Sequence, residues 1–343
     1  MSRYIIYGAG AIGSILGARL YLAGCDVLLI ARSAHAEAIR TGGLELHHLG
    51  VVRRIHLPAL DSPFQVKPAA TDRVLVTLKA QQTASEVETM EKAFLPEVPI
   101  VSFQNAVHNE EILAGFFSRV YGGLVDFSGT YVKPGVVYYT RNNILAIGNY
   151  PSGFDSAAES IAQDLERAGF QADRSADIMA LKWWKLIINS NNALLAILDC
   201  WVQKAHSDPA IYPLVADVLE ESYRVLAKAG IQIQAPAGVP AMPEMIVRMR
   251  AGGMASEYDT PFEKRTYPST WQDLHLKRGA SEAELFNGEI LRLAWENGIP
   301  APLNRFLLAT LVKMTRKREM PGKCSPAEMK SNFEELQKEG RCK

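Results

Sequence analysis

Several features that would place a protein in a specialised class are missing from this sequence. Its 343 residues include 37 Lys and Arg against 37 Asp and Glu, so no charge excess points to nucleic acid or to an anionic membrane surface. No run reaches the roughly 18 uninterrupted apolar residues of a membrane span. Glycines interrupt the apolar N-terminus, which argues against a signal peptide.

Cysteine is also scarce, with four residues that lie far apart and form no CxxC pair: Cys25, Cys200, Cys324 and Cys342. Scattered thiols are typical of a reducing compartment, and this spacing argues against a zinc site or a disulfide framework. The sequence therefore predicts a cytoplasmic protein without a metal site, whose partner is a small molecule rather than a nucleic acid or a membrane.

The first half of the chain alternates short apolar runs with helical patterns. Strands are predicted at residues 3–8, 26–30, 73–78 and 99–103, with helices after the first two. Continuous apolar strands separated by helices favour a parallel sheet covered on both faces. Residues 136–148 are predicted to form a later antiparallel hairpin at the edge of this sheet.

The second half differs after about residue 150, because most of its segments have the periodicity of helices. Residues 212–230 and 280–298 are examples, and each ends in a glycine of the kind that closes helices. The charged tail from about Thr315 is expected to be loosely packed. We therefore expect two domains: an α/β Rossmann-type N-terminal domain with a parallel sheet (1–176), followed by an all-α C-terminal domain (177–343).

The stretch "YIIYGAGAIGS" places a GxGxxG pattern between a predicted strand and a predicted helix. In this setting Gly8 permits a tight turn, Gly10 lets the backbone approach a pyrophosphate, and Gly13 packs the helix on the strand. The helix N-terminus would then face the phosphates. The alternative is a glycine-rich turn without a ligand. A dinucleotide site is predicted at six consecutive residues, Gly8, Ala9, Gly10, Ala11, Ile12 and Gly13.

Polar residues follow three more predicted strands. Arg32 stands after the second strand, where folds that bind NAD often have Asp or Glu. Its guanidinium suits a 2′-phosphate, which favours NADP(H) over NAD(H). Lys79 and Asn105 follow the next two strands, at the edge where open α/β sheets bind ligands. The alternatives are a solvated charge for Arg32, a loop charge for Lys79 and a turn former for Asn105.

The run "KWWKLIINSNNALLAI" at residues 182–197 is mostly apolar but carries amines and amides. Lys185, Asn189 and Asn192 fall on one narrow stripe of a helix, and Lys182 lies near the edge of that stripe without an assignable role. A buried lysine is costly unless it is paired or useful. The pattern indicates one wall of a binding site, and the alternative is a solvated stripe or satisfied amides in a helix core.

Ser269 and Glu282 belong to a polar segment further along the chain. The residues from Ser281 to Glu284 form a capping-box pattern with Ser281 as the N-cap. Glu282 then falls in the first helical turn, where a carboxylate complements the helix dipole. Its alternative is a functional carboxylate, which the spacing alone does not favour.

Together these segments resemble the ketopantoate reductase (2-dehydropantoate 2-reductase) family over nearly the whole chain. The matching motifs occur in the order "YGAGAIGS", "LLIAR", "LKA", "FQNAV", "WWKLIINSNNAL", "PSTWQD", "SEAELFNGEI" and "ENGIPAPLN". The resemblance implies a Rossmann domain, a helical domain that binds the substrate and dimerises, and NADPH-dependent reduction of a 2-keto acid in the cleft. It implies that Arg32 holds the 2′-phosphate, and that Lys79 and Asn105 line the nicotinamide and substrate side.

The resemblance also implies the residues that handle the acid. Lys185 and Glu282 would be catalytic, and the substrate-binding residues would be Asn105, Asn189, Asn192 and Ser269. Three features depart from the family. Ala106 stands where members usually have Gly, the asparagines of the stripe are three residues apart where some members have four, and the linker before Ser269 and the C-terminal tail look longer.

The expected activity is the NADPH-dependent reduction of a small 2-keto acid, with 2-dehydropantoate to pantoate, a step toward pantothenate and coenzyme A, in first place. The ammonium of Lys185 would stabilise and protonate the oxygen that gains charge as the hydride arrives. Two alternatives stay open: an NADPH reductase of the same fold for another 2-keto acid or an imine, and a non-enzymatic NADP(H) sensor. A homodimer is compatible with either.

Overall fold

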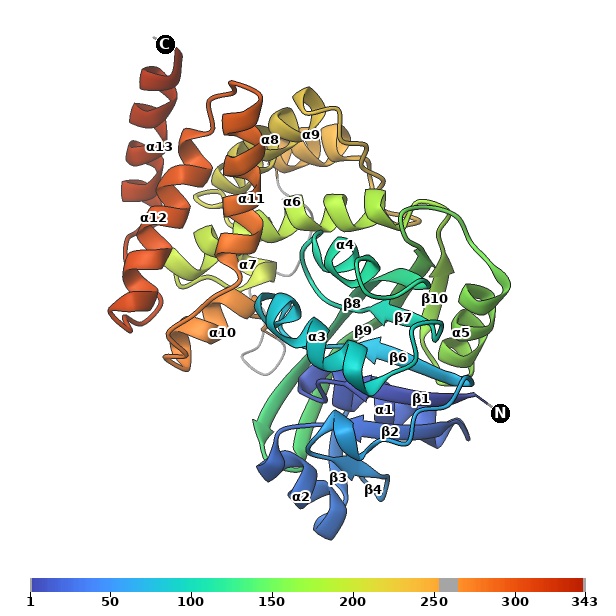
Figure 1. Ribbon diagram of the computed structural model, residues 1–343. Coiled ribbons are helices and arrows are strands. Elements are labelled where there is room, and N and C mark those ends of the chain that lie inside the picture. The colour runs from blue at the N-terminus through green and yellow to red at the C-terminus, as the bar shows by residue number, and fades with distance from the viewer. Residues whose placement is uncertain (1, 253–264, 342–343) are drawn as a thin grey trace. The chain divides into compact units, whose positions relative to one another are not determined.

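The computed structural model describes residues 2–252 and 265–341. The chain divides into two compact units, Met1–Lys182 and Trp183–Lys343, and the division falls within helix α6 (Ile178–Ile197). In Figure 1 the first unit runs from blue to green and the second from yellow-green to red. The domain limits 1–176 and 177–343 stay a prediction. Most of the long linker expected before Ser269 lies in residues 253–264, outside the described residues.

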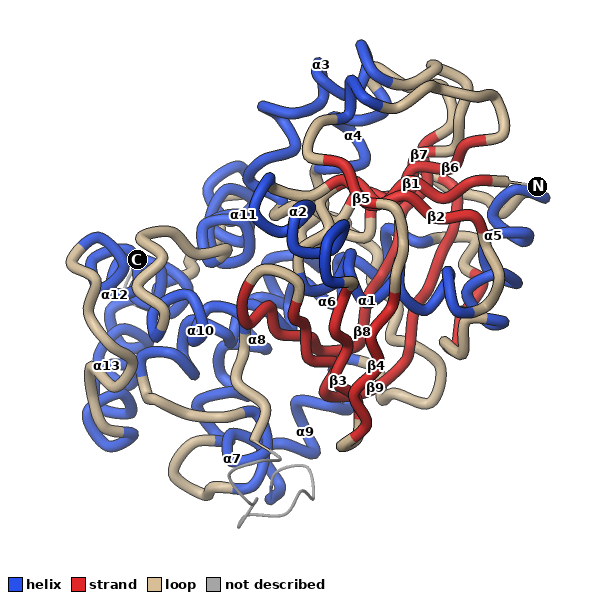
Figure 2. The backbone as a smooth tube through the Cα atoms, turned by 90° about the horizontal axis from the view of Figure 1, so that it is seen from below, coloured by secondary structure: helices blue, strands red, loops and turns tan. Residues whose placement is uncertain are grey.

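The first unit is built on a ten-stranded sheet whose central strands are parallel. Figure 2 shows the strands of this sheet in red. Six parallel strands follow one another in the order β5 (Ala59–Leu60), β2 (Asp26–Ile30), β1 (Arg3–Tyr7), β6 (Asp72–Val76), β7 (Ile100–Ser102) and β8 (Val120–Lys133). This is the strand order of a Rossmann fold, and the order reverses between β1 and β6, where such sheets bind dinucleotides. The predicted parallel sheet is confirmed, and the four strands expected from the sequence are β1, β2, β6 and β7.

The sheet continues beyond β8 with further strands, of which the sequence indicated only the region of β9. β9 (Val136–Asn149) pairs antiparallel with β8, parallel with β3 (Leu44–His48) and parallel with β10 (Gln171–Arg174). The prediction of a hairpin at the sheet edge was therefore wrong, because this segment is one long strand with partners on both sides. The edge of the sheet on this side is β4 (Val51–Ile55), which forms a hairpin with β3 through two residues of positive φ, Leu49 and Gly50.

Helices cover both faces of the sheet, because successive strand residues point to opposite sides. Ile6 packs into a core with α1 (Ala11–Leu22), α2 (Ser33–Gly42) and α5 (Ser156–Arg167). Its neighbour Ile5 packs into a second core with α3 (Thr83–Ala93) and α4 (Asn109–Ala114). Two short 3-10 helices, η1 (Pro63–Gln65) and η2 (Ala80–Gln82), contact α3 on the same side of the sheet.

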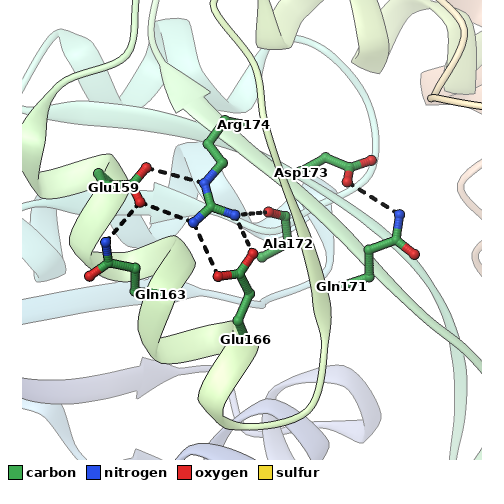
Figure 3. A network of polar contacts seen from close by, with 7 residues as sticks. All are labelled: Glu159, Gln163, Glu166, Gln171, Ala172, Asp173 and Arg174. Atoms are coloured by element: carbon green, nitrogen blue, oxygen red, sulfur yellow. Dashed lines mark hydrogen bonds and ion pairs between the residues drawn. The ribbon is translucent and has the colours of Figure 1, made fainter.

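Arg174 ties β10 to α5, as Figure 3 shows. Its guanidinium donates to both carboxylate oxygens of Glu159, at 3.1 and 3.0 Å, and also pairs with Glu166. A further bond of 2.9 Å reaches the carbonyl oxygen of Ala172 on its own strand. These two carboxylates raise the pKa of Arg174. Because these ion pairs lie at the surface, we expect them to hold β10 against α5 and to contribute little to the overall free energy of unfolding.

All the regular secondary structure in the described residues of the second unit is helical. Outside residues 253–264 and 342–343, it holds most of α6 and seven further helices, α7 (Val202–Ser207), α8 (Tyr212–Lys228), α9 (Met242–Gly252), α10 (Ser269–His275), α11 (Ala283–Glu296), α12 (Pro302–Arg316) and α13 (Pro326–Arg341). α8 lies at its centre and contacts α7, α9, α11, α12 and α13. The expectation of a loosely packed tail was wrong, because α13 buries Met329 and Phe333 completely.

Candidate functional site

The glycine-rich turn lies between β1 and α1, where the strand order reverses. Gly8 has φ +96°, and a Cβ there would come within 2.8 Å of the Leu78 backbone nitrogen. A Cβ at Gly13 would come within 2.4 Å of Thr77 Oγ1. At Gly10, by contrast, the nearest atom would be the Gly8 oxygen at 3.9 Å, so packing within the chain does not require glycine there. The open side of Gly10 fits the close approach of a pyrophosphate.

The start of α1 has the properties of an anion site. Ala11 and Ile12 are its first helical residues, and the helix begins without a side-chain cap and without an acidic residue in its first turn. Its N–H groups and its dipole therefore favour a negative ligand. The N–H groups of Gly8 and Ala9 both donate to the Ile30 oxygen, at 3.1 and 2.8 Å, which anchors the turn to β2.

A buried hydrogen-bond relay supports the turn from behind. The Gly135 N–H donates to His35 Nδ1 at 2.9 Å, so the proton of the neutral imidazole is on Nε2. His35 Nε2 then donates to Ser14 Oγ at 3.1 Å, and Ser14 Oγ donates to the carbonyl oxygen of Ala9 at 3.1 Å. This arrangement works only with neutral His35, and burial lowers the pKa of His35 to about 4.

This shift predicts a pH dependence of stability. An exposed histidine titrates near pH ~6.5, so between about pH 6.5 and 4 the unfolded chain binds a proton that the folded chain does not. The stabilisation is complete above pH ~6.5 and is lost as the pH falls toward about 4, by roughly 3 kcal/mol at most. Urea unfolding across this range should therefore show a steeper acid loss in the wild-type protein than in His35→Gln. Parallel losses in both proteins would contradict the relay.

Arg32 follows β2 and occupies the N-cap position of α2, where its side chain is exposed. Among the residues that the structure describes, no carboxylate pairs with it. Its charge acts on the phenol of Tyr131 in β8, whose pKa is raised by burial and lowered to a lesser extent by Arg32. Tyr131 also packs edge-to-face on His35, with ring centroids 5.0 Å apart. An exposed guanidinium at a helix start suits a phosphate group.

Lys79 and Asn105 lie at the same edge of the sheet as the glycine-rich turn and Arg32. Lys79 follows β6 and is exposed, and Asn105 follows β7 and is half-buried. β2, β1, β6 and β7 are consecutive neighbours in the sheet, and parallel strands end at one edge. The structure therefore brings the four groups predicted from separate parts of the sequence to one edge.

The turn after β7 is held by side-chain bonds that the sequence did not suggest. Gln104 Nε2 donates to the Leu78 oxygen at 3.1 Å and to Thr83 Oγ1 at 2.9 Å. Thr83 Oγ1 donates to Asn109 Oδ1 at 2.8 Å, and Asn109 Nδ2 donates to the Asn105 oxygen at 2.7 Å. The loops after β6 and β7 are thereby joined.

Ala106, which stands where the resemblance led us to expect glycine, has φ +68°. This is the left-handed region, which costs an L-residue about 1–2 kcal/mol. The turn after Asn105 therefore keeps the backbone conformation that suits glycine, and the bonds around it hold the strained residue in place.

Helix α6 carries the predicted polar stripe. Lys185, Asn189 and Asn192 are half-buried, together with Ile188, whereas the positions between them are buried. These positions have the spacing of one helical face. Asn192 Nδ2 lies 3.5 Å from Asn189 Oδ1, so the two amides are neighbours. Lys182 differs from them, because it is buried and paired within the first unit.

Ser269 and Glu282 mark the starts of two other helices of the second unit. Ser269 is the first residue of α10, and Glu282 is the N-cap of α11 with only 3% of its surface exposed. The capping-box prediction was wrong, because Glu282 rather than Ser281 is the N-cap of α11. Helical hydrogen bonding already starts at the Glu282 oxygen, which accepts from the N–H of Leu285 at 2.9 Å.

A buried polar network joins the helices of the second unit. Glu221 of α8 accepts from the N–H groups of Leu303 and Asn304 at the start of α12, at 3.0 and 2.8 Å. Asn287 Nδ2 of α11 donates to Asn304 Oδ1 and to the Ser190 oxygen of α6, both at 2.9 Å. Burial raises the pKa of Glu221, although the hydrogen bonds from Leu303 and Asn304 act in the opposite direction. Ser190 adjoins Asn189, so the network fixes the register of α6 against α11.

Some of these features had no local signal in the sequence. Asn191 looks like its neighbours in "NSNN", yet it is buried on another face, and neither of its amide atoms has a partner among the described residues. In the described part of the chain, no helix is long and apolar enough to cross a membrane. Within the same residues, no group of three His, Cys, Asp or Glu side chains could hold a metal ion.

A Rossmann-order sheet with this turn, and a helical unit with a polar face on α6, define the class of dinucleotide-dependent oxidoreductases. Family models described as "Ketopantoate reductase PanE/ApbA" and "Ketopantoate reductase PanE/ApbA C terminal" match residues 4–152 and 177–315. The chain belongs to the ketopantoate reductase family.

Individual relatives agree with this assignment. The chain is 31% identical to a 2-dehydropantoate 2-reductase of Archaeoglobus fulgidus, over 90% of this chain and 96% of the relative. A PanE/ApbA family ketopantoate reductase of Ralstonia eutropha has a similar structure, with TM-score 0.77, 28% identity and 92% and 99% of the two chains covered. A D-mandelate dehydrogenase with NADH and anilino(oxo)acetate shares the fold, with TM-score 0.80, 24% identity and the same coverage.

Proposed function

We propose that this protein reduces a small 2-keto acid with NADPH, and that the acid is 2-dehydropantoate, which becomes pantoate. The observation that carries the proposal is the half-buried face of Lys185, Asn189 and Asn192 on helix α6, where the positions between Lys185 and Asn192 are otherwise buried apart from Ile188. An amine beside two amides suits a keto acid, which offers a carbonyl oxygen and a carboxylate. The name of the Archaeoglobus relative supports the choice of substrate.

The first unit would bind the cofactor. The turn from Gly8 to Gly13 would hold the pyrophosphate, Arg32 the 2′-phosphate, and Lys79 and Asn105 the nicotinamide side. NADPH, when bound, supplies the hydride. The exposed guanidinium of Arg32 favours NADPH over NADH, because an ion pair with a phosphate is available only to NADPH. We include residues 1–176 in this cofactor domain.

The second unit would act on the acid. The ammonium of Lys185 would stabilise the negative charge that develops on the keto oxygen and then donate a proton to it. Glu282 would complete the catalytic pair. Asn189, Asn192 and Ser269, together with Asn105, would donate hydrogen bonds to the carboxylate and hydroxyl groups of the substrate. Substrate binding and dimerisation are proposed for residues 177–343.

The test is NADPH oxidation with ketopantoate, pyruvate, 2-ketoisovalerate and oxaloacetate, repeated with NADH. We expect kcat/KM to be about 10-fold or more higher for ketopantoate than for the smaller pyruvate, because missing methyl and hydroxyl groups leave the site incompletely filled. We expect NADPH to exceed NADH by about 10- to 100-fold, the contribution of one charged hydrogen bond.

Three results would contradict parts of this proposal. A higher kcat/KM with another keto acid or with an imine would change the substrate and keep the reaction class. Equal rates with NADH would remove the role of Arg32. Tight NADPH binding without oxidation by any acid would instead support a non-enzymatic sensor.

A further inference from the structure

We infer that Lys182 is a positioning residue, whose buried ion pair with Glu110 holds the Gln104–Asn105 peptide and through it Asn105. This inference rests on the proposed function, which assigns Asn105 to the cofactor and the substrate. It gives a role to the lysine that the polar stripe of α6 left unassigned.

Lys182 meets two groups of the loop and helix that follow β7. Its ammonium forms an ion pair with Glu110 of α4, and Nζ also donates to the Gln104 carbonyl oxygen at 3.2 Å. The exposed fractions of the two charged side chains are 3% and 0%. All three residues belong to the first unit, so the arrangement is internal to it.

Stability alone gives no reason for such a pair. Removing two charges from water costs several kcal/mol per ion, and apolar residues of similar size often do as well or better. Glu110 Oε2 has no hydrogen-bond partner among the described residues, so its charge is compensated on one side only. What an apolar pair could not provide is an N–H donor aimed at the carbonyl oxygen of Gln104.

That bond completes the support of Asn105 from both sides. The carbonyl before Asn105 accepts from Lys182, and its own carbonyl accepts from Asn109 Nδ2 at 2.7 Å. The next residue, Ala106, is held in the left-handed region. Because the peptides on both sides of Asn105 are fixed, its side chain can move only by changing rotamer. The amide group is therefore held close to one position, where it can bind a ligand.

The test replaces the whole pair, so that no charge is left unpaired. In Lys182→Met/Glu110→Leu we expect kcat/KM for the keto acid to fall about 10- to 100-fold, because small misplacements of a binding group have effects of this size. The Kd for NADPH should change less than about threefold, because most of the proposed contacts of the cofactor lie elsewhere. In an Asn105→Ala background, the same double replacement should lower kcat/KM by less than about twofold, since a residue acting through Asn105 has nothing left to position.

A matched control is the ion pair of Arg3 and Asp72, which lie at the N-terminal ends of β1 and β6. The glycine-rich turn and Lys79 follow the other ends of these two strands. The Nε–Oδ1 distance of the ion pair is 2.9 Å and Asp72 is buried. Arg3→Met/Asp72→Leu should keep the kinetics of the wild type. If the Lys182 double variant does not fold, Lys182→Arg keeps the charge but moves the donors onto a planar fork, and the same loss in kcat/KM is expected. Wild-type kinetics in the folded variant, or an undiminished loss in the Asn105→Ala background, would overturn the inference.

Amide hydrogen exchange separates this inference from the proposed function. Exchange of residues 104–109 should be faster in the Lys182 double variant than in the wild type, and unchanged in the Arg3 control. Unchanged protection of this loop would overturn the inference, whatever the enzyme does. A wild-type protein that reduces no keto acid would defeat only the proposed function, and the exchange measurement would still decide the role of Lys182.

Discussion

Replacement of Lys185 by alanine is expected to lower kcat for the keto acid by about 10²- to 10⁴-fold, the size of a general acid's contribution. The keto oxygen then gains charge without a neighbouring ammonium and without a proton donor. The Kd for NADPH should change less than about twofold, because the proposed contacts of the cofactor are made by the turn from Gly8 to Gly13, Arg32, Lys79 and Asn105 rather than by Lys185. Steady-state kinetics and a titration of NADPH fluorescence measure the two effects separately.

Two variants sharpen this test. Lys185→Arg keeps the positive charge but holds its proton too firmly to transfer it, so it should restore little of the lost kcat. Lys204→Ala removes a partly exposed lysine of α7 that lies 3.8 Å from Asp208, and it should leave kcat unchanged. Turnover near the wild-type rate in Lys185→Ala would end the assignment of this lysine as the proton donor.

Replacement of Arg32 by glutamate is expected to reverse the choice of cofactor. The carboxylate would repel the 2′-phosphate of NADPH and accept hydrogen bonds from the free ribose hydroxyls of NADH. We expect kcat/KM with NADPH to fall about 10²-fold or more, since an attractive charged contact becomes repulsive, and kcat/KM with NADH to rise. Because Arg32 is exposed, salt should weaken the wild-type preference for NADPH.

Arg40→Glu is the matched control for this variant. Arg40 lies in the last turn of the same helix, α2, and pairs with Glu37 at the surface. It should leave the ratio of NADPH to NADH activity unchanged. If Arg32→Glu keeps the wild-type ratio of NADPH to NADH activity, the residue at the start of α2 does not distinguish the two cofactors.

Much of the fold was readable because its signals are local. The glycines at positions 8 and 13 are required by their immediate surroundings, and the strands beside them are short, continuous and apolar. The edge strand β4 was not readable, because four of its five residues are exposed and they show no alternation of buried and exposed positions. For a similar reason the long strand β9 was misplaced, since its position depends on β3 and β10, which pair with it from distant parts of the chain.

The candidate site divides in the same way. The stripe of Lys185, Asn189 and Asn192 follows from helical periodicity, and the helix places it as expected. The N-cap position of Glu282 was misread by one residue, because short patterns do not fix helix ends. Lys182 looked like a member of the stripe's edge, yet its partner is 72 residues away in the sequence.

The sequence by itself determined the Rossmann turn, the position of Arg32 after a strand and the polar face of α6, because spacing within one element decides each of them. Only the tertiary structure decided the order in which these strands lie side by side, and that Lys182 is paired with Glu110 next to the Gln104–Asn105 peptide. The physical reason is that a buried charge is tolerated only with its partner, and strand order rather than sequence distance sets where that partner lies.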